Sequence, residues 1–383
     1  MKSTIYNNIF QFIKSLYPNL TQVPLHAPVF CGNEKEYVLD TLETTMVSSV
    51  GEYVNKFEDM IAKYTNSHRA VATVNGTSAL HVALLLNGVR NDDEVITQAL
   101  TFVATANAIS FCNATPVFID VDKDTLGMSP NALSHFLKKN AIIKDGKTCN
   151  RRTGRKIAAC VPMHTFGHPC RIDEIVDICR EYNIKIVEDA AESLGSKYKN
   201  KHTGTFGDFG VFSLNGNKTI TSGCGGAIIT NDKNLADRAK HITTTAKNQH
   251  QYEYIHDEIA FNYRLANINA ALACAQMEQL DLFIDSKRKL SQKYNGYFEK
   301  ININFINEPK NAWSNFWLNG IVLDNIEERD EFLKRSHENN IQSRPIWRLL
   351  NKLPMYKNCQ TDNLSNSNWL ESRVVNIPSS VIK

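Results

Sequence analysis

Short apolar runs alternate with amphipathic stretches along the chain from about residue 70. Strands that are buried on both faces of a sheet have such nearly continuous apolar composition, and these runs are too short for helices. We predict strands at RAVATV, DEVIT, TPVFIDV, KIAACVPM (156–163), IKIVED (184–189) and GDFGVFSL (207–214). The stretches between them have helical spacing, as in TSALHVALLLNG and FVATANAISFC. Strands that alternate with helices predict an α/β fold with a mainly parallel sheet and helices on both faces.

The pattern changes at about residue 260. A helical pattern then continues without Gly or Pro as far as Gly296, which predicts one long helix. We therefore predict an N-terminal arm and large domain over residues 1–260, a linking long helix over 261–290 and a smaller C-terminal α/β subdomain over 291–383. The first 18 residues have apolar positions at helical spacing and no continuous apolar core, so we expect an amphipathic helix and not a signal peptide.

Length, net charge and cysteine usage argue against several classes of protein. The 383 residues exceed the size at which one core stops growing. The net charge is only +3, from 43 basic and 40 acidic residues, which argues against a nucleic-acid-binding protein. Nine cysteines without a CxxC pair are typical of reduced thiols in a cytoplasmic protein. No apolar run approaches the about 20 residues that span a bilayer, so we expect no membrane segment.

The stretch VNGTSALHVAL (74–84) predicts a site for an anion. A buried strand ends there, the chain turns at Asn75 and Gly76, and a helix begins at Thr77 and Ser78. The unpaired N–H groups and the positive end of the helix dipole attract a phosphate, and the two hydroxyls add donors. The alternative is an ordinary helix start, since Thr and Ser are common caps.

Two acids, Glu188 and Asp189, close an apolar strand at its carboxyl end, where parallel sheets bind ligands. A carboxylate there needs a partner, and the protonated ring nitrogen of a cofactor is one. The alternative is a helix N-cap, in which Asp189 and Glu192 form a capping box.

Lys218 follows a predicted strand and precedes Gly223, Gly225 and Gly226, which let backbone approach a ligand closely. A partly desolvated lysine loses its proton more easily and can form a Schiff base with a carbonyl. The alternative is a surface lysine in a loop. His164 follows another strand end and is a candidate for a pocket histidine near a cofactor ring. A structural histidine is the alternative, and we predict no metal site because no second ligand has suitable spacing.

Together these signals match the needs of pyridoxal phosphate. Its phosphate needs N–H and hydroxyl donors, its pyridine nitrogen needs a carboxylate that keeps it protonated, and its aldehyde needs a lysine amine. The anion site at residues 76–78, Asp189 and Lys218 supply these three groups, in this order along the chain. We therefore predict that Lys218 binds this cofactor covalently.

The chain resembles the DegT/DnrJ/EryC1/StrS family of sugar-nucleotide aminotransferases, which belong to fold type I of the pyridoxal phosphate enzymes. The matching motifs lie in the expected order between residues 47 and 280: VSSVGEYVNKFE, NGTSALHVAL, TFVATANA, VFIDVD, EDAAESLGS, FGDFGVFSLNGNKTITSGCGG and FNYRLANINAALACAQME. The resemblance implies cofactor contacts from Gly76, Thr77, Ser78, Phe102, Asp189, Ser213 and Asn262, with Lys218 as the Schiff-base lysine. Asn262 would reach the phosphate from a partner subunit, which implies a homodimer.

One departure from the family pattern is Glu192, where glutamine is usual, near the cofactor's 3-hydroxyl. Glutamate there resembles the branch that acts on UDP-linked 4-keto-6-deoxy-N-acetylhexosamines and makes precursors of legionaminic acid and bacillosamine. This branch implies glutamate as amino donor, a 4-amino sugar nucleotide as product and Lys218 as the general base and acid. The candidate substrate contacts are Ser49, Asn217, Arg344, Trp347 and Arg348, although the last three could equally form a structural edge.

Two other interpretations stay open. The acceptor could be a GDP- or dTDP-linked keto sugar, or the chain could be a non-catalytic regulatory or binding protein. Family members that act as 3-dehydratases carry histidine in place of the lysine, so Lys218 favours transamination.

Overall fold

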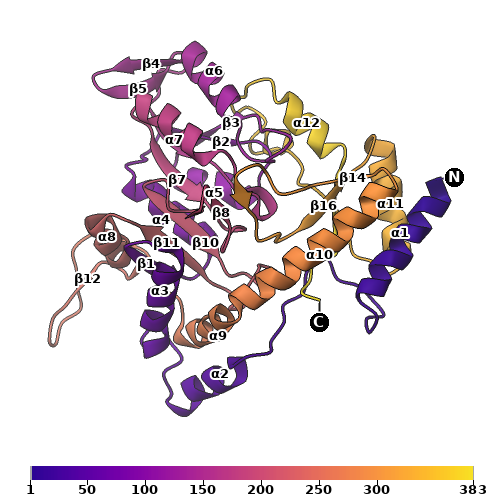
Figure 1. Ribbon diagram of the computed structural model, residues 1–383. Coiled ribbons are helices and arrows are strands. Elements are labelled where there is room, and N and C mark those ends of the chain that lie inside the picture. The colour runs from indigo at the N-terminus through magenta and orange to yellow at the C-terminus, as the bar shows by residue number, and fades with distance from the viewer. Residues whose placement is uncertain (1, 383) are drawn as a thin grey trace.

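A seven-stranded sheet forms the centre of the computed structural model, which describes residues 2–382 (Figure 1). Neighbouring strands are parallel from β10 through β7, β6 and β2 to β3, whereas β11 runs antiparallel to β10 and β1. The predicted mainly parallel, mixed sheet is therefore confirmed. In sheet order the strands are β1 (Arg69–Thr73), β11 (Gly226–Thr230), β10 (Phe209–Ser213), β7 (Lys185–Asp189), β6 (Ile157–Val161), β2 (Glu94–Gln98) and β3 (Thr115–Ile119).

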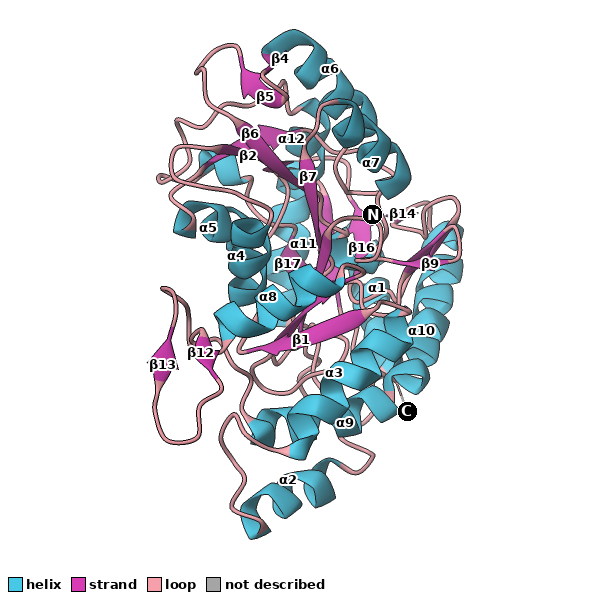
Figure 2. Cartoon of the chain, turned by 90° about the vertical axis from the view of Figure 1, so that its left-hand side faces the viewer, coloured by secondary structure: helices cyan, strands magenta, loops and turns pink. Residues whose placement is uncertain are grey.

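Alternate residues of the strands face two helix layers, because successive side chains point to opposite faces of a sheet. Val71 and Ile228 pack with α4, α5 and α8, whereas Ala70 and Ile229 pack with α3 and α9. Ile186 and its neighbours pack with α6 and α7. Figure 2 shows α4 and α5 on one side of β6 and β7, and α6 and α7 on the other. These helices are α3 (Glu52–Thr65), α4 (Gly76–Leu86), α5 (Val103–Phe111), α6 (Pro130–Asn140), α7 (Ile172–Glu181), α8 (Lys233–Thr243) and α9 (Asn267–Glu278).

The predicted single long helix is wrong, because the chain forms two helices, α9 and α10 (Leu280–Lys300). Gln279 ends the first and begins the second, with φ −102° and ψ −2°. The first helix packs under α3 and the sheet, and the second continues to the C-terminal part of the chain. No Gly or Pro marks the change of direction, so packing sets the break.

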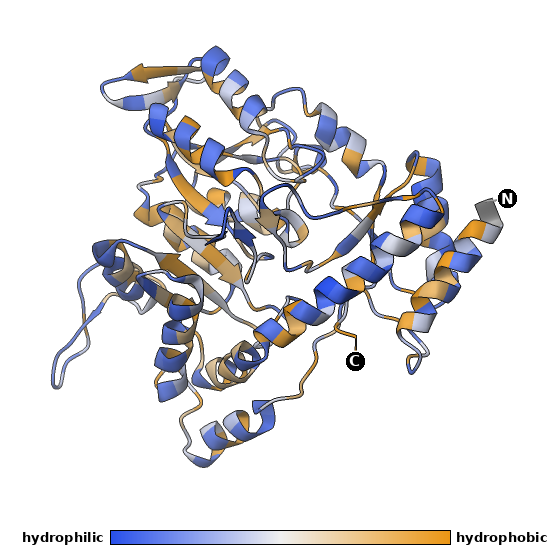
Figure 3. Cartoon of the chain, in the orientation of Figure 1, coloured by the Kyte–Doolittle hydropathy of each residue, from blue (hydrophilic) through white to orange (hydrophobic). Residues whose placement is uncertain are grey.

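The C-terminal part contains a four-stranded sheet in the order β14, β16, β18, β17. The predicted N-terminal amphipathic helix is present as α1 (Lys2–Leu16), and its Ile9, Phe10 and Ile13 are buried against α10 and α11. Figure 3 shows apolar strands inside and hydrophilic residues on the outer helices. The elements are β14 (Asn304–Phe305), β16 (Asn319–Val322), α11 (Ile326–Glu338), β17 (Arg344–Pro345), α12 (Ser365–Glu371) and β18 (Val374–Ile377).

The remaining elements lie at the periphery. The β12–β13 hairpin projects from the body (Figure 1). Within residues 2–382, no helix has both the length and the apolar character that crossing a membrane requires. The elements are α2 (Glu34–Glu43), β4 (Ala141–Lys144), β5 (Lys147–Asn150), η1 (Thr165–Gly167), β8 (Lys197–Tyr198), β9 (Lys201–His202), β12 (Lys247–Asn248), β13 (Ile255–His256), β15 (Ala312–Trp313) and η2 (Leu350–Lys352).

Candidate active site

The carboxyl ends of β1, β7 and β10 bring the predicted cofactor residues to one edge of the sheet. β7 ends at Asp189, β10 ends at Ser213, and β1 leads through a short turn into α4. Lys218 lies in the loop after β10. Parallel strands place their carboxyl ends at the same edge, so residues far apart in sequence meet there.

Lys218 is held in a partly buried position, and the surface-loop alternative is wrong. Its side chain is 13% exposed, and Nζ lies 3.2 Å from Oε1 of Glu192. The same Nζ lies 4.1 Å from the centroid of the Trp317 ring. The other carboxylate oxygen of Glu192 accepts the Phe166 N–H at 2.9 Å. Burial raises the pKa of Glu192 to about 7, although the Lys218 ammonium opposes this shift.

Asp189 is a buried carboxylate with two donors from the protein. Oδ2 accepts the Thr105 hydroxyl at 2.7 Å and Oδ1 accepts the Ala191 N–H at 3.2 Å. Burial raises the pKa of Asp189, and these two bonds partly counter the shift. No helix begins after Asp189, since residues 190–195 form turns, so the capping-box alternative is wrong. A buried carboxylate here suits a protonated ring nitrogen as an ion partner.

The N-terminus of α4 lies against the end of β10. Asn75 caps the helix by accepting the Ser78 N–H at 2.8 Å. A Cβ atom added to Gly76 would lie 3.1 Å from the Cβ of Ser213, so the two residues are neighbours. The first N–H groups of a helix have no intrahelical partner, and the hydroxyls of Thr77 and Ser213 add donors beside them. This group of donors fits a phosphate.

Gly226 has a different role from the predicted approach to a ligand. A Cβ atom there would lie 2.6 Å from the carbonyl carbon of Asn75. The glycine therefore lets β11 approach the turn before α4. In this way it helps to position the donors that fit a phosphate.

Phe102 lies at the start of α5, the helix whose Thr105 binds Asp189. Its side chain is 50% exposed, although it is a large aromatic residue. An exposed ring at the start of the helix that binds Asp189 is suited to stacking on a planar cofactor.

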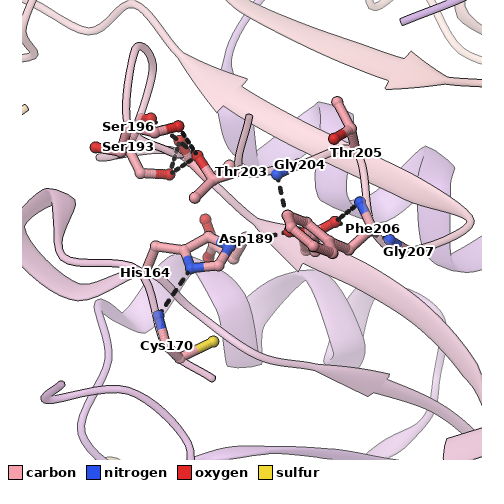
Figure 4. Close-up of polar contacts among 12 residues, drawn as sticks. His164, Cys170, Asp189, Ser193, Ser196, Thr203, Gly204, Thr205, Phe206 and Gly207 are labelled. Carbon is pink, nitrogen blue, oxygen red and sulfur yellow. Dashed lines mark hydrogen bonds and ion pairs between the residues drawn. The ribbon is translucent and has the colours of Figure 1, made fainter. Parts of the chain in front are cut away.

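His164 is fully buried and uses both ring nitrogens within the protein (Figure 4). Nε2 lies 3.0 Å from Oε2 of Glu188, and Nδ1 accepts the Cys170 N–H at 3.2 Å. The arrangement favours the structural alternative for His164 over a polar contact with the cofactor ring.

Glu188 accepts three backbone N–H groups in addition to His164. These come from Gly204, Phe206 and Gly207, at 2.8, 2.5 and 2.8 Å (Figure 4). Neighbouring residues of a strand point to opposite faces, so Glu188 binds the loop before β10 while Asp189 faces the candidate site.

The predicted substrate residues are only partly brought together. The Asn217 carbonyl accepts the indole N–H of Trp317 at 2.6 Å, and the Trp347 ring lies 5.0 Å from that of Phe166. Asn217 and Trp347 therefore each contact a residue that binds Lys218 or its partner Glu192. Ser49 is half-buried before α3, and no contact among the described residues joins Lys218 to the remaining predicted residues Ser49, Asn262, Arg344 and Arg348.

Sequence reasoning missed Thr105 and Trp317, which contact Asp189 and Lys218 directly. Thr105 lies in TFVATANA, a segment already compared with the family, and Trp317 lies in SNFWLNGI (314–321). The available signal was that Thr105 is a polar residue, and Trp317 a large aromatic residue, within mainly apolar runs.

Comparisons with known proteins agree with this geometry. The family model described as the DegT/DnrJ/EryC1/StrS aminotransferase family matches residues 31–381. This chain belongs to that family. It is a sugar-nucleotide aminotransferase of fold type I that uses pyridoxal phosphate. It is 39% identical to the GDP-perosamine synthase of Escherichia coli O157:H7 over 87% of each chain. It is 34% identical to that of Vibrio cholerae over 93% of this chain and 94% of the relative.

Solved structures have the same fold. The aminotransferase TlmJ from Streptoalloteichus hindustanus superposes with a TM-score of 0.84 and is 22% identical, over 94% of this chain and 93% of the other. At this identity the likeness shows the fold alone. The non-catalytic alternative is wrong, because both the family and the convergence of Lys218, Asp189 and the α4 N-terminus are those of an enzyme.

We expect Lys218→Ala to abolish covalent attachment of the cofactor and to lower transamination about 10²- to 10⁴-fold, because no other amine replaces it as base. Borohydride reduction followed by mass spectrometry should find the pyridoxyl group on the Lys218 peptide of the wild type only. Lys233→Ala, at an exposed position of α8, is the control and should behave as wild type. Label on another lysine would contradict the assignment.

A second prediction concerns Glu192 in the cofactor-free protein. Its pKa is raised to about 7, so the folded chain binds this proton more tightly than the unfolded chain. The resulting stabilisation is present below about pH 4.5 and is lost as the pH rises through about 7. Glu192→Gln cannot titrate. The free energy of unfolding of the wild type minus that of Glu192→Gln should therefore fall by up to about 3 kcal/mol over this range.

Urea unfolding at a series of pH values measures this difference. Glu181→Gln, at an exposed position at the end of α7, is the control and should show no comparable pH dependence. A constant difference between the wild type and Glu192→Gln from pH 4.5 to 7 would show that Glu192 is not held in the buried environment described.

Proposed function

We propose that the enzyme transfers an amino group from glutamate to a GDP-linked keto sugar and releases the 4-amino sugar nucleotide. The support for GDP is the identity of 39% and 34% to two GDP-perosamine synthases over most of each chain. The UDP-linked N-acetylhexosamine expected from sequence resemblance has no support among these relatives. It rests on Glu192 and on short motifs only.

The observation that carries the proposed chemistry is the convergence of Lys218, Glu192 and Asp189. Bound pyridoxal phosphate acts as an electron sink when its ring nitrogen is protonated. Asp189 would keep that proton on the ring, and Thr105 would orient the carboxylate. Lys218 Nζ would carry a proton between a carbon of the cofactor and a carbon of the substrate. Glu192, whose Oε1 lies 3.2 Å from Nζ, would hold this proton between the two transfers.

The residues around the edge of the site would fix the position of the cofactor. Gly76, Thr77, Ser78 and Ser213 would bind its phosphate, and the half-exposed Phe102 would cover its ring. The nine cysteines are all unpaired, which supports the expected reducing cytoplasm. A 4-amino sugar nucleotide made there would supply the glycosyl transfer reactions of surface glycan synthesis.

We also propose a homodimer with shared active sites. Asn262 is exposed, close to the projecting β12–β13 hairpin. Large apolar side chains on and after α2 are exposed in the single chain: Leu39, Leu42, Met46, Val47 and Val50. A patch of this kind is typical of a protein–protein interface, and a second copy would cover it.

The visible spectrum of the cofactor-loaded enzyme tests the reaction and the acceptor. Glutamate should bleach the absorbance of the bound cofactor, and a GDP-linked 4-keto-6-deoxy sugar should restore it. A UDP-linked 4-keto-6-deoxy-N-acetylhexosamine and a dTDP-linked keto sugar serve as matched acceptors, and we expect slower recovery with both. Recovery with the UDP sugar alone would reject the GDP proposal, and absence of bleaching would reject glutamate as donor.

Co-expression of two inactive variants tests the shared site. In a mixed dimer of Lys218→Ala and Asn262→Ala, one site carries both changes and the other carries neither, so about half of its sites should be active. Each variant expressed alone is the control. Failure of the mixed dimer to exceed either parent would show that Asn262 serves its own subunit or no site.

A further inference from the structure

Trp317 forms one wall around the amine of Lys218. Its side chain is 4% exposed, and Lys218 Nζ lies 4.1 Å from its ring centroid. The indole N–H donates to the Asn217 carbonyl at 2.6 Å. One side chain therefore contacts the reactive nitrogen through its ring face and fixes the adjoining backbone through its edge.

The turn that carries Trp317 is strained and tightly bound. Phe316 has φ 47°, a left-handed conformation that is unfavourable for a bulky side chain. Such strain persists only where surrounding contacts impose it, and it concentrates at functional sites. Asn315 supplies contacts of this kind. Its Oδ1 accepts the Trp317 N–H, and its Nδ2 donates to the Glu192 carbonyl, both at 2.9 Å.

Lys287, on α10, holds the other side of this turn. It is fully buried, and Nζ donates to the Trp317 carbonyl at 3.1 Å and to the Ser379 carbonyl at 2.6 Å. Among residues 2–382 no carboxylate forms an ion pair with it. Burying an amine without an anion is costly, and burial lowers the pKa of Lys287 well below its ordinary value.

The N-terminal arm and the C-terminal segment close over Lys287. Ser379 donates its N–H to the Leu25 carbonyl at 2.7 Å, and Ala27 donates to the Ser380 hydroxyl at 2.9 Å. His26 lies between them, with both ring nitrogens buried and without a hydrogen-bond partner. Burial lowers the pKa of His26, and the charges of Lys287 and Lys218 lower it further.

We propose that Lys287 is a positioning residue for Lys218 and acts through the strained turn that carries Trp317. Its two bonds fix the Trp317 backbone against the C-terminal segment, and the indole in turn fixes Lys218 and Asn217. This role explains why a lysine without an anionic partner lies fully buried at this position. The inference rests on the proposed function, because it concerns the lysine that transfers the proton.

The test compares Lys287→Met, Lys287→Gln and Trp317→Phe with the wild type. Lys287→Met removes both bonds, Lys287→Gln retains an amide donor, and Trp317→Phe removes the indole N–H and the five-membered ring but keeps an aromatic face. We expect the rate of bleaching by saturating glutamate to fall about ten-fold in Lys287→Met, with partial rescue in Lys287→Gln, because small misplacement of a reacting group is costly. Lys289→Met, at an exposed position of the same helix, should behave as wild type.

Two further readouts separate positioning from stability. The visible circular dichroism of the bound cofactor should change in Lys287→Met and in Trp317→Phe. Urea midpoints should fall in Lys287→Met, because two buried carbonyls lose their donor. A lower midpoint with unchanged bleaching rate and dichroism would assign Lys287 a purely structural role and overturn the inference.

The variants also cover the case in which Lys287→Met does not fold. Trp317→Phe leaves Lys287 in place and keeps an aromatic ring, and a wild-type rate and dichroism in this variant would then overturn the inference. A wild-type protein that glutamate fails to bleach would instead reject the proposed function, so the two failures are distinguishable.

Discussion

The fully buried carboxylate of Glu188 is the contact on which the geometry of the site depends. Glu188 is the second-last residue of β7, and it accepts the N–H groups of Gly204, Phe206 and Gly207 together with the His164 imidazole. A buried carboxylate is tolerated only when such donors replace water. By binding this loop, Glu188 fixes the start of β10, and β10 leads directly to Ser213 and Lys218. Loss of this contact would therefore misplace both the phosphate donors and the reactive amine.

Three acids close together in sequence have different environments. Glu188 is satisfied by backbone donors, Asp189 by Thr105 and one N–H, and Glu192 by Lys218 and the Phe166 N–H. Burial raises the pKa of both Asp189 and Glu192, so neither charge is fully compensated by the protein alone. A protonated cofactor nitrogen would compensate the charge of Asp189, and Lys218 compensates part of the charge of Glu192. The site therefore suits a ligand whose positively charged group lies at the carboxyl edge of the sheet.

Sequence patterns predicted the strands, most helices and the residues at the carboxyl ends of β7 and β10, because apolar periodicity and strand ends are local properties. They could not predict the break at Gln279, which packing imposes without Gly or Pro. They also could not show that Phe166 and Phe316 adopt left-handed φ values of 57° and 47°, conformations that local preference assigns to glycine. The contacts of Trp317 and Lys287 join distant segments, and only the tertiary structure brings them to Lys218.

The central claim is that the sheet edge places the Asp189 carboxylate on the pyridine nitrogen of the cofactor. The most direct measurement is the nitrogen-15 NMR shift of ring-labelled pyridoxal phosphate bound to the wild type and to Asp189→Asn. We expect a protonated ring nitrogen in the wild type and a neutral one in Asp189→Asn, because the variant has no carboxylate to retain the proton. A neutral nitrogen in the wild type, or a protonated one in both proteins, would contradict the central claim.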